Sequence, residues 1–268
     1  MQPGGTIDVQ ITIRPTIGLH IKTGQVEIAC TEQWWSKETP AASGDGKLEI
    51  QPVLPQPLVQ SFISDTEFTN TTPVVRYARI QIPKDCLPTI HGSVAQVAWQ
   101  LSARLEIENA GAITASREVT VLTSPVVKTG RSVAALTEEA RFTDCTLALV
   151  LVNDAAGAGG YLEGELRAGM KNSKHVRDVR VELHSAESAG ERNAASIREK
   201  VSLVSNLKLS PTEEPYVWAF SLPVPEQTLP TVKSGHTTVS WRLKAVVDTE
   251  ETSDAYHVER EIQIFTSA

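Results

Sequence analysis

Residues 82–105, IPKDCLPTIHGSVAQVAWQLSARL, are echoed without a gap by residues 224–247, VPEQTLPTVKSGHTTVSWRLKAVV. The two stretches share a proline, a Leu-Pro-Thr triplet and a Val-x-Trp-x-Leu-x-Ala alternation, all at a constant spacing of 142 residues. A second match, REVTVLTS at 117–124 and REIQIFTS at 260–267, ends both copies on the same kind of segment. An internal duplication of this length predicts two tandem domains.

Apolar and polar residues alternate with a period of two through most of the chain, and Gly, Pro, Asn and Asp clusters separate the alternating stretches. Such short runs, rich in Val, Ile, Thr and Trp, are typical of strands with one buried face. Clear examples are IDVQITI (7–13), GQVEIAC (24–30), VAQVAWQLSARLEI (94–107), TLALVLV (146–152) and REIQIFT (260–266). Because no helices alternate with these strands, the sequence predicts antiparallel sheets packed face to face.

We therefore predict an all-β fold of two tandem antiparallel β-sandwiches of immunoglobulin-like type. The N-terminal sandwich covers residues 1–125, a linker covers 126–140, and the C-terminal sandwich covers 141–268. In both copies the repeated tryptophan, Trp99 or Trp241, alternates with aliphatic residues on one face, so we assign both to the cores.

Three stretches are less regular. SKETPAASGDGK (36–47) is polar and rich in small residues, which predicts a mobile loop. ALTEEAR (135–141) is compatible with a single helical turn. SAESAGERNAASIREK (185–200) fits either a short helical turn or a loop.

The composition narrows the classes of partner. The chain has 268 residues and a net charge of −7, which disfavours phosphate backbones, so we expect no nucleic acid partner and no anionic membrane surface. No apolar run is long enough to cross a bilayer, so we expect no integral membrane segment. The first residues lack the features of a secretory signal, so the expected location is cytoplasmic.

Catalytic and metal-binding patterns are missing from the sequence. The three cysteines, Cys30, Cys86 and Cys145, are far apart, and they are expected to be free, small hydrophobic residues. The six histidines are scattered singly, and no nucleophile, phosphate-loop or dinucleotide motif occurs. We therefore expect a protein that is not an enzyme, with no catalytic residues, no metal and no cofactor.

Two groups of residues are candidates for partner binding. Trp34 and Trp35 are adjacent, and because neighbouring side chains on a strand point to opposite faces, at most one lies in the core. The other is a candidate hot spot, unless the loop that follows covers it. Lys171, Lys174, Arg177 and Arg180 form a basic cluster that fits an acidic peptide or phosphate; a solvated strand face is the plainer interpretation.

The second half resembles the C-terminal domain of the arrestin-like family. The similarity lies in Gly164-Glu165 before a strand, Asn172-Ser173 at a turn, the apolar series Val176, Val179, Val181 and Leu183, and the later FSLPVPEQTLPT and VSWRLKAVVD stretches. This family includes arrestins, arrestin-domain trafficking adaptors, a retromer subunit and bacterial Spo0M-type sporulation regulators. The resemblance implies tandem arrestin-type sandwiches that bind proteins without catalysis.

These observations lead to three functional hypotheses. The first is an adaptor or scaffold that binds a protein or peptide at a sheet edge or in an interdomain groove. The second is a Spo0M-like cytoplasmic regulatory protein whose domains reorient about the linker. The third is a ligand- or carbohydrate-binding β-sandwich protein, or an enzyme on the same scaffold, because fold alone does not decide function.

Overall fold

The computed structural model describes residues 1–36, 47–123, 136–250 and 255–266. Within these residues all the regular elements are β-strands, and most strand pairs are antiparallel. The predicted all-β, antiparallel fold is therefore confirmed. The predicted loop over 36–47 falls almost entirely outside the described residues.

The chain divides into two compact units. Unit 1 comprises Met1–Thr123 with Ala189–Glu191, and unit 2 comprises Ser124–Ser188 with Arg192–Ala268. The division after Thr123 lies close to the boundary predicted at 125. Strand β9 (Thr137–Arg141) begins inside the range 126–140 that the sequence predicts as linker, and residues 124–135 lie outside the described part.

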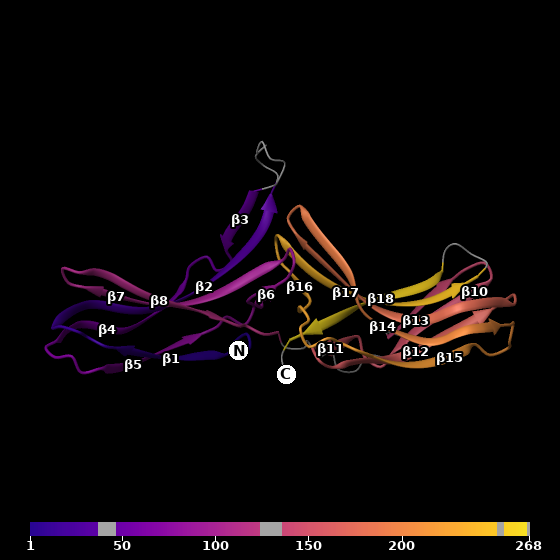
Figure 1. The fold of residues 1–268 in the computed structure, drawn as a ribbon, viewed down its shortest axis with the longest axis horizontal. Coiled ribbons are helices and arrows are strands. Elements are labelled where there is room, and N and C mark those ends of the chain that lie inside the picture. Colours follow the sequence, from indigo (N-terminus) through magenta and orange to yellow (C-terminus); the bar gives the residue numbers. More distant parts are fainter. Residues whose placement is uncertain (37–46, 124–135, 251–254, 267–268) are drawn as a thin grey trace. The chain divides into compact units, whose positions relative to one another are not determined.

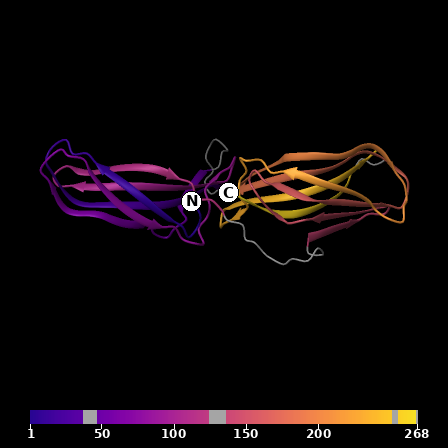
Figure 2. The ribbon, with the colours of Figure 1, turned by 90° about the horizontal axis from the view of Figure 1, so that it is seen from below.

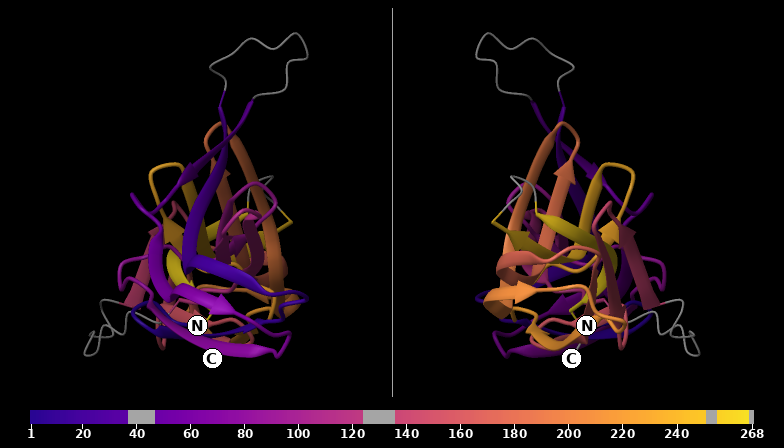
Figure 3. Two further views of the ribbon diagram at one scale, coloured as in Figure 1. Left: turned by 90° about the vertical axis from the view of Figure 1, so that its left-hand side faces the viewer. Right: turned by 90° about the vertical axis from the view of Figure 1, so that its right-hand side faces the viewer.

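Unit 1 contains a two-stranded and a six-stranded sheet. Their strands are β1 (Thr6–Ile13), β2 (Leu19–Ser36), β3 (Lys47–Pro52), β4 (Leu58–Phe68), β5 (Val74–Gln81), β6 (Ile90–His91), β7 (Gln96–Ile107) and β8 (Gly111–Val119). β1 pairs with β5, while β2 and β7 form the centre of the larger sheet. In Figure 1, β1 and β5 run below β7 and β8, and so face the reader in Figure 2. β3 and the end of β2 project from these layers as an arm (Figure 3).

The core of unit 1 joins its two sheets. Ile13 of β1 packs in one cluster with Ile21 of β2 and with Ile63 and Phe68 of β4. Each of these residues occupies a buried position in an alternating strand, which is the pattern that the sequence predicts.

Unit 2 contains a four-stranded and a six-stranded sheet. Its strands after β9 are β10 (Cys145–Leu151), β11 (Ala155–Gly157), β12 (Tyr161–Met170), β13 (Lys174–Ala189), β14 (Arg192–Leu209), β15 (Tyr216–Pro223), β16 (Val232–Lys233), β17 (Thr237–Thr249) and β18 (Tyr256–Phe265). The smaller sheet has the order β15-β12-β10-β9, and the larger has β11-β18-β17-β13-β14 with β16 beside β17. β12 and β15 lie below β17 and β18 in Figure 1. The β11–β18 pair is parallel.

The repeated tryptophans occupy the same place in both units. Trp99 in β7 and Trp241 in β17 are both buried. Each indole N–H donates to a backbone carbonyl twelve residues earlier, Trp99 to Leu87 at 2.9 Å and Trp241 to Leu229 at 3.0 Å. The Leu-Pro-Thr connection therefore supplies the polar partner that a buried indole needs.

The helical turn expected over 135–141 is wrong, and neither alternative for 185–200, a helical turn or a loop, describes most of that stretch. Thr137–Arg141 is the strand β9, because pairing with β10 satisfies its backbone groups, whereas one isolated turn of helix is unfavourable. Most of 185–200 belongs to the strands β13 and β14, which Gly190 joins with a positive φ of 60°. Glycine adopts this conformation without steric cost.

Candidate functional site

β1 and β8 are both edge strands within the described part of unit 1. β1 pairs only with β5, and β8 pairs only with β7. A groove of about 600 Å³ lies between these edges, formed by Ile7–Gln10 of β1, Leu101 and Ala103 of β7, and Ala115–Val119 of β8. Unpaired edges present backbone N–H and C=O groups to any extended chain that reaches them.

The backbone pairing shows which groups of β1 face the groove. The Ile82 N–H donates to the Gly5 carbonyl at 2.8 Å. Gly5 and Ile82 therefore form a hydrogen-bonded pair that continues the β1–β5 ladder by one residue. Because such pairs alternate along an antiparallel ladder, the odd-numbered residues of β1 direct their backbone groups toward β5. The backbone groups of Asp8 and Gln10 therefore point outward along the free edge.

In unit 2 the corresponding space is filled. Leu101 and Ala103 pair with Arg117 and Ala115 across β7–β8, just as Leu243 and Ala245 pair with Arg260 and Val258 across β17–β18. Leu243 and Ala245 are 0% exposed, whereas Leu101 and Ala103 are half-buried.

The two units also differ in β10. This strand pairs with the side of β12 that faces away from β15, and its inward residues are fully or almost fully buried: Cys145, Leu147, Leu149 and Leu151. No described segment of unit 1 pairs with the corresponding side of β1.

The same contrast runs along β8 and β18. Ile113 and Ala115 of β8 are exposed, and Ile113 is 59% exposed. Their counterparts in the β18 ladder, Tyr256 and Val258, retain 8% and 3%. Ala115 lines the groove and Ile113 is exposed, whereas the matching positions of unit 2 are buried. An exposed apolar groove of this kind indicates an interaction site.

The predicted tryptophan pair lies on β2, outside this groove. Trp34 is buried with 6% exposure, and Trp35 on the opposite face is half-buried. One of the pair is therefore a core residue and the other is partly covered. A substitution of Trp34 would disturb core packing, so its effect on partner binding could not be separated from its effect on the fold.

The predicted basic cluster does not form one free cationic patch. Lys174 pairs with Asp144 at 3.0 Å, and the Lys171 ammonium donates to the Thr143 carbonyl at 2.9 Å. Arg177 pairs with Asp248 at 2.7 Å, and Arg180 pairs with Glu182 at 2.6 Å. All four side chains meet acceptors of unit 2, and the Lys174 and Arg180 side chains are only 13% and 24% exposed.

The cysteines are free, and two of them are buried. Burial raises the pKa of Cys30 and of Cys145 to about 12, so neither is a thiolate near neutral pH. Burial also raises the pKa of Cys86, which is half-buried. These thiols have the environment of structural residues.

Sequence spacing gives no signal for one cluster of titratable groups. His20 in β2 contacts Glu108 through Nδ1 and Asp65 through Nε2, both at 2.9 Å, although these partners are 88 and 45 residues away. The Glu108 hydrogen bond, followed by that of Asp65, raises the pKa of His20 above its ordinary value. The imidazolium form donates to both carboxylates and so links β2, β4 and the residue after β7.

This cluster predicts a pH-dependent contribution to stability. A histidine pKa that is raised in the folded state stabilises fully below the unfolded pKa of about 6.5, and the contribution is lost as pH rises through the folded pKa. We expect His20→Gln to lower the free energy of unfolding more at about pH 5.5 than at about pH 8.5. Urea unfolding at both pH values measures this, with His257→Gln as the surface control. An equal loss at both pH values would contradict the assignment.

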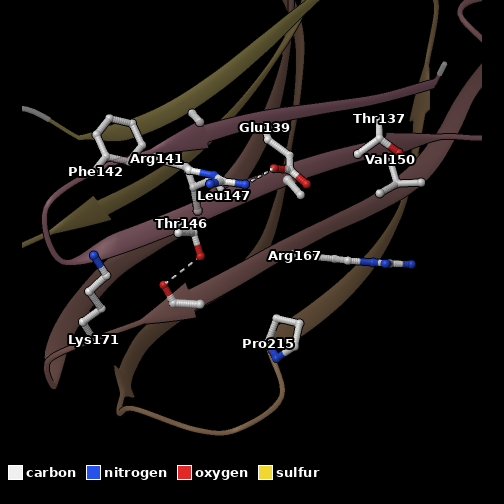
Figure 4. A pocket seen from close by; sticks show the side chains of 13 residues that line it. Thr137, Glu139, Arg141, Phe142, Thr146, Leu147, Val150, Arg167, Lys171 and Pro215 are labelled. Carbon is white, nitrogen blue, oxygen red and sulfur yellow. Dashed lines mark hydrogen bonds and ion pairs between the residues drawn. The ribbon is translucent and has the colours of Figure 1, made fainter. Parts of the chain in front are cut away.

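A second hollow lies on the outer face of β9, β10 and β12 in unit 2 (Figure 4). Its charged side chains bond to their neighbours: Arg141 contacts Glu139 at 3.3 Å, and Arg167 contacts Glu165 at 2.9 Å. Figure 4 shows Arg167 and Lys171 extending from separate places on the wall. The hollow therefore lacks a set of converging groups.

The described residues contain neither a metal-binding cluster nor a membrane-spanning helix. No group of three or more His, Cys, Asp or Glu side chains there is arranged to hold a metal ion. The described part of the chain also contains no helix of the length and apolarity that a bilayer span requires. Comparison with protein-family models and with characterised proteins finds no match to this chain.

Proposed function

We propose that this protein is a non-enzymatic adaptor that binds an extended segment of a partner protein in the groove between β1 and β8. One observation carries the proposal: Leu101 and Ala103 lie in an open groove, whereas Leu243 and Ala245 at the matching ladder positions are fully buried in the unit where β10 extends the opposite sheet. Strand addition at an edge supplies main-chain hydrogen bonds for affinity and side-chain pockets for specificity.

We also propose that the protein arose by duplication of one sandwich and that it is cytoplasmic. The repeated sequence and the matching indole hydrogen bonds of Trp99 and Trp241 support two tandem sandwiches derived from one unit, as the arrestin-like resemblance implies. The free cysteines support a cytoplasmic location, because disulfides are rare in that compartment.

A proline at position 10 tests strand addition. Because the Gln10 N–H points away from β5, Gln10→Pro removes a donor of the free edge without removing a ladder bond, and proline is tolerated on edge strands. We expect Gln10→Pro to weaken partner binding about tenfold, while Gln10→Ala, which keeps the N–H, binds like the wild type. Immobilised wild type and both variants are offered the same native lysate, and retained proteins are quantified by mass spectrometry.

A partner retained by the wild type and Gln10→Ala but depleted on Gln10→Pro supports the proposal. Partners that bind all three proteins equally would show that the β1 edge is not the binding surface. Circular dichroism of the two variants establishes that both are folded.

A further inference from the structure

Arg117 is a charged residue on the inner side of the groove. Its ladder partner Leu101 faces that side, and cross-strand neighbours share a face. Arg117 is exposed and has no ion pair or hydrogen bond to any residue that the structure describes. The groove therefore presents an apolar floor beside an available guanidinium.

The matching arginine of unit 2 is paired. Arg260, opposite Leu243, places Nη1 3.6 Å from Oε2 of Glu138 and Nη2 3.6 Å from Oδ2 of Asp154. Its side chain is 15% exposed. The β9–β10 hairpin, which lies beside β12, thus brings the Glu138 carboxylate to this arginine.

Glu138 belongs to β9, which forms a hairpin with β10. Glu138 lies opposite Leu149 in the ladder, so the carboxylate and the buried leucine share the inward face. One short hairpin therefore combines apolar side chains at alternate positions with an inward acidic group. Glu139, the next residue, points outward, where it pairs with Arg141.

We propose that the occupant of the β1–β8 groove is a partner segment with this same chemistry. The segment is a hairpin: one strand runs antiparallel to β1 and carries apolar side chains at every second position, and the neighbouring strand offers a carboxylate to Arg117. This inference rests on the proposed function and names the class of partner. An arginine beside an apolar floor selects an acidic side chain over a neutral one, because a charge-assisted bond is stronger than a neutral bond.

The hairpin of this chain provides the probe. Residues 136–152 carrying Cys145→Ser are joined by a flexible linker to a soluble carrier protein, and titration calorimetry measures binding to the full-length chain. We expect saturable binding that Arg117→Gln weakens about fivefold, since Arg117 loses its carboxylate partner.

Matched changes in the probe and in the protein identify the charge pair. Glu138→Gln in the probe is expected to weaken binding as much as Arg117→Gln in the protein, and the two changes together are expected to cost no more than either alone. Arg117→Glu with Glu138→Lys is expected to restore binding. Glu139→Gln in the probe is the matched control and is expected to change nothing.

Several results would overturn the inference. A probe that fails to bind, or binds equally well to Arg117→Gln, has no carboxylate contact with this arginine; exchange with β10 in unit 2 would give the second result. If either occurs while Gln10→Pro still depletes a cellular partner, the acidic-segment chemistry is wrong and strand addition at β1 stands. If Gln10→Pro has no effect either, the proposed function is also wrong.

Discussion

Trp241→Ala is expected to lower the free energy of unfolding of unit 2 by about 3–5 kcal/mol, which is the usual cost of truncating a buried tryptophan. The side chain is 2% exposed, and its indole N–H is bonded to the Leu229 carbonyl. The substitution both opens a cavity and leaves that carbonyl without its partner. Because small domains are stable by about 5–15 kcal/mol, this loss is large.

Trp99→Ala is expected to have the same effect on unit 1, since Trp99 is fully buried and bonded to Leu87. Hydrogen exchange followed by mass spectrometry in increasing urea assigns each transition to peptides of one unit. Trp218→Ala is the control, because Trp218 is half-buried on β15 and stacks on Tyr216 with ring centroids 6.0 Å apart. Losses at Trp99 and Trp241 no larger than at Trp218 would contradict their place in the cores.

Much of the fold could be predicted because burial follows the alternation of the strands. The segment 7–13 alternates without interruption, and the strand β1 (Thr6–Ile13) occupies almost the same residues. Trp99 and Trp241 were assigned to the cores from the same period, and both are buried. In such strands a local pattern reports directly which face meets the opposing sheet.

Elements that depend on pairing could not be predicted in this way. The Thr137–Arg141 segment has few apolar residues, and its strand conformation comes from the ladder with β10. Sequence propensity is a weak guide where a neighbouring strand supplies the backbone partners. The cluster around His20 was missed for a related reason, because residues 45 and 88 positions away meet only in the folded sheet.

The groove is marked by no motif in the sequence, because it depends on how the strands pair. β1 pairs with β5 as β12 pairs with β15, with Thr6 opposite Gln81 and Tyr161 opposite Pro223. Among the described residues of unit 1, no strand occupies the place that β9 and β10 take beside β12. Single residues such as Trp35 attract attention by their chemistry, whereas an unpaired strand edge is a property of topology.

Backbone amides on the free edge of β1 are expected to exchange much faster with solvent than the matching amides of β12. Asp8 and Gln10 direct their N–H groups outward along the free edge. At the matching positions of β12, Glu163 and Glu165 face β10; the Glu163 carbonyl accepts from the Val152 N–H at 2.9 Å. The amides of Asp8 and Gln10 are therefore expected to exchange about a thousandfold faster than those of Glu163 and Glu165, or more.

The most direct test of the account is hydrogen exchange of these four amides by NMR, in the free full-length protein and with a saturating amount of the 136–152 carrier fusion. We expect fast exchange at Asp8 and Gln10 in the free protein, strong protection of both when the fusion is bound, and slow exchange at Glu163 and Glu165 throughout. Protection of Asp8 and Gln10 in the free protein equal to that of Glu163 and Glu165 would mean that the β1 edge is already paired, and would contradict an open strand site in unit 1.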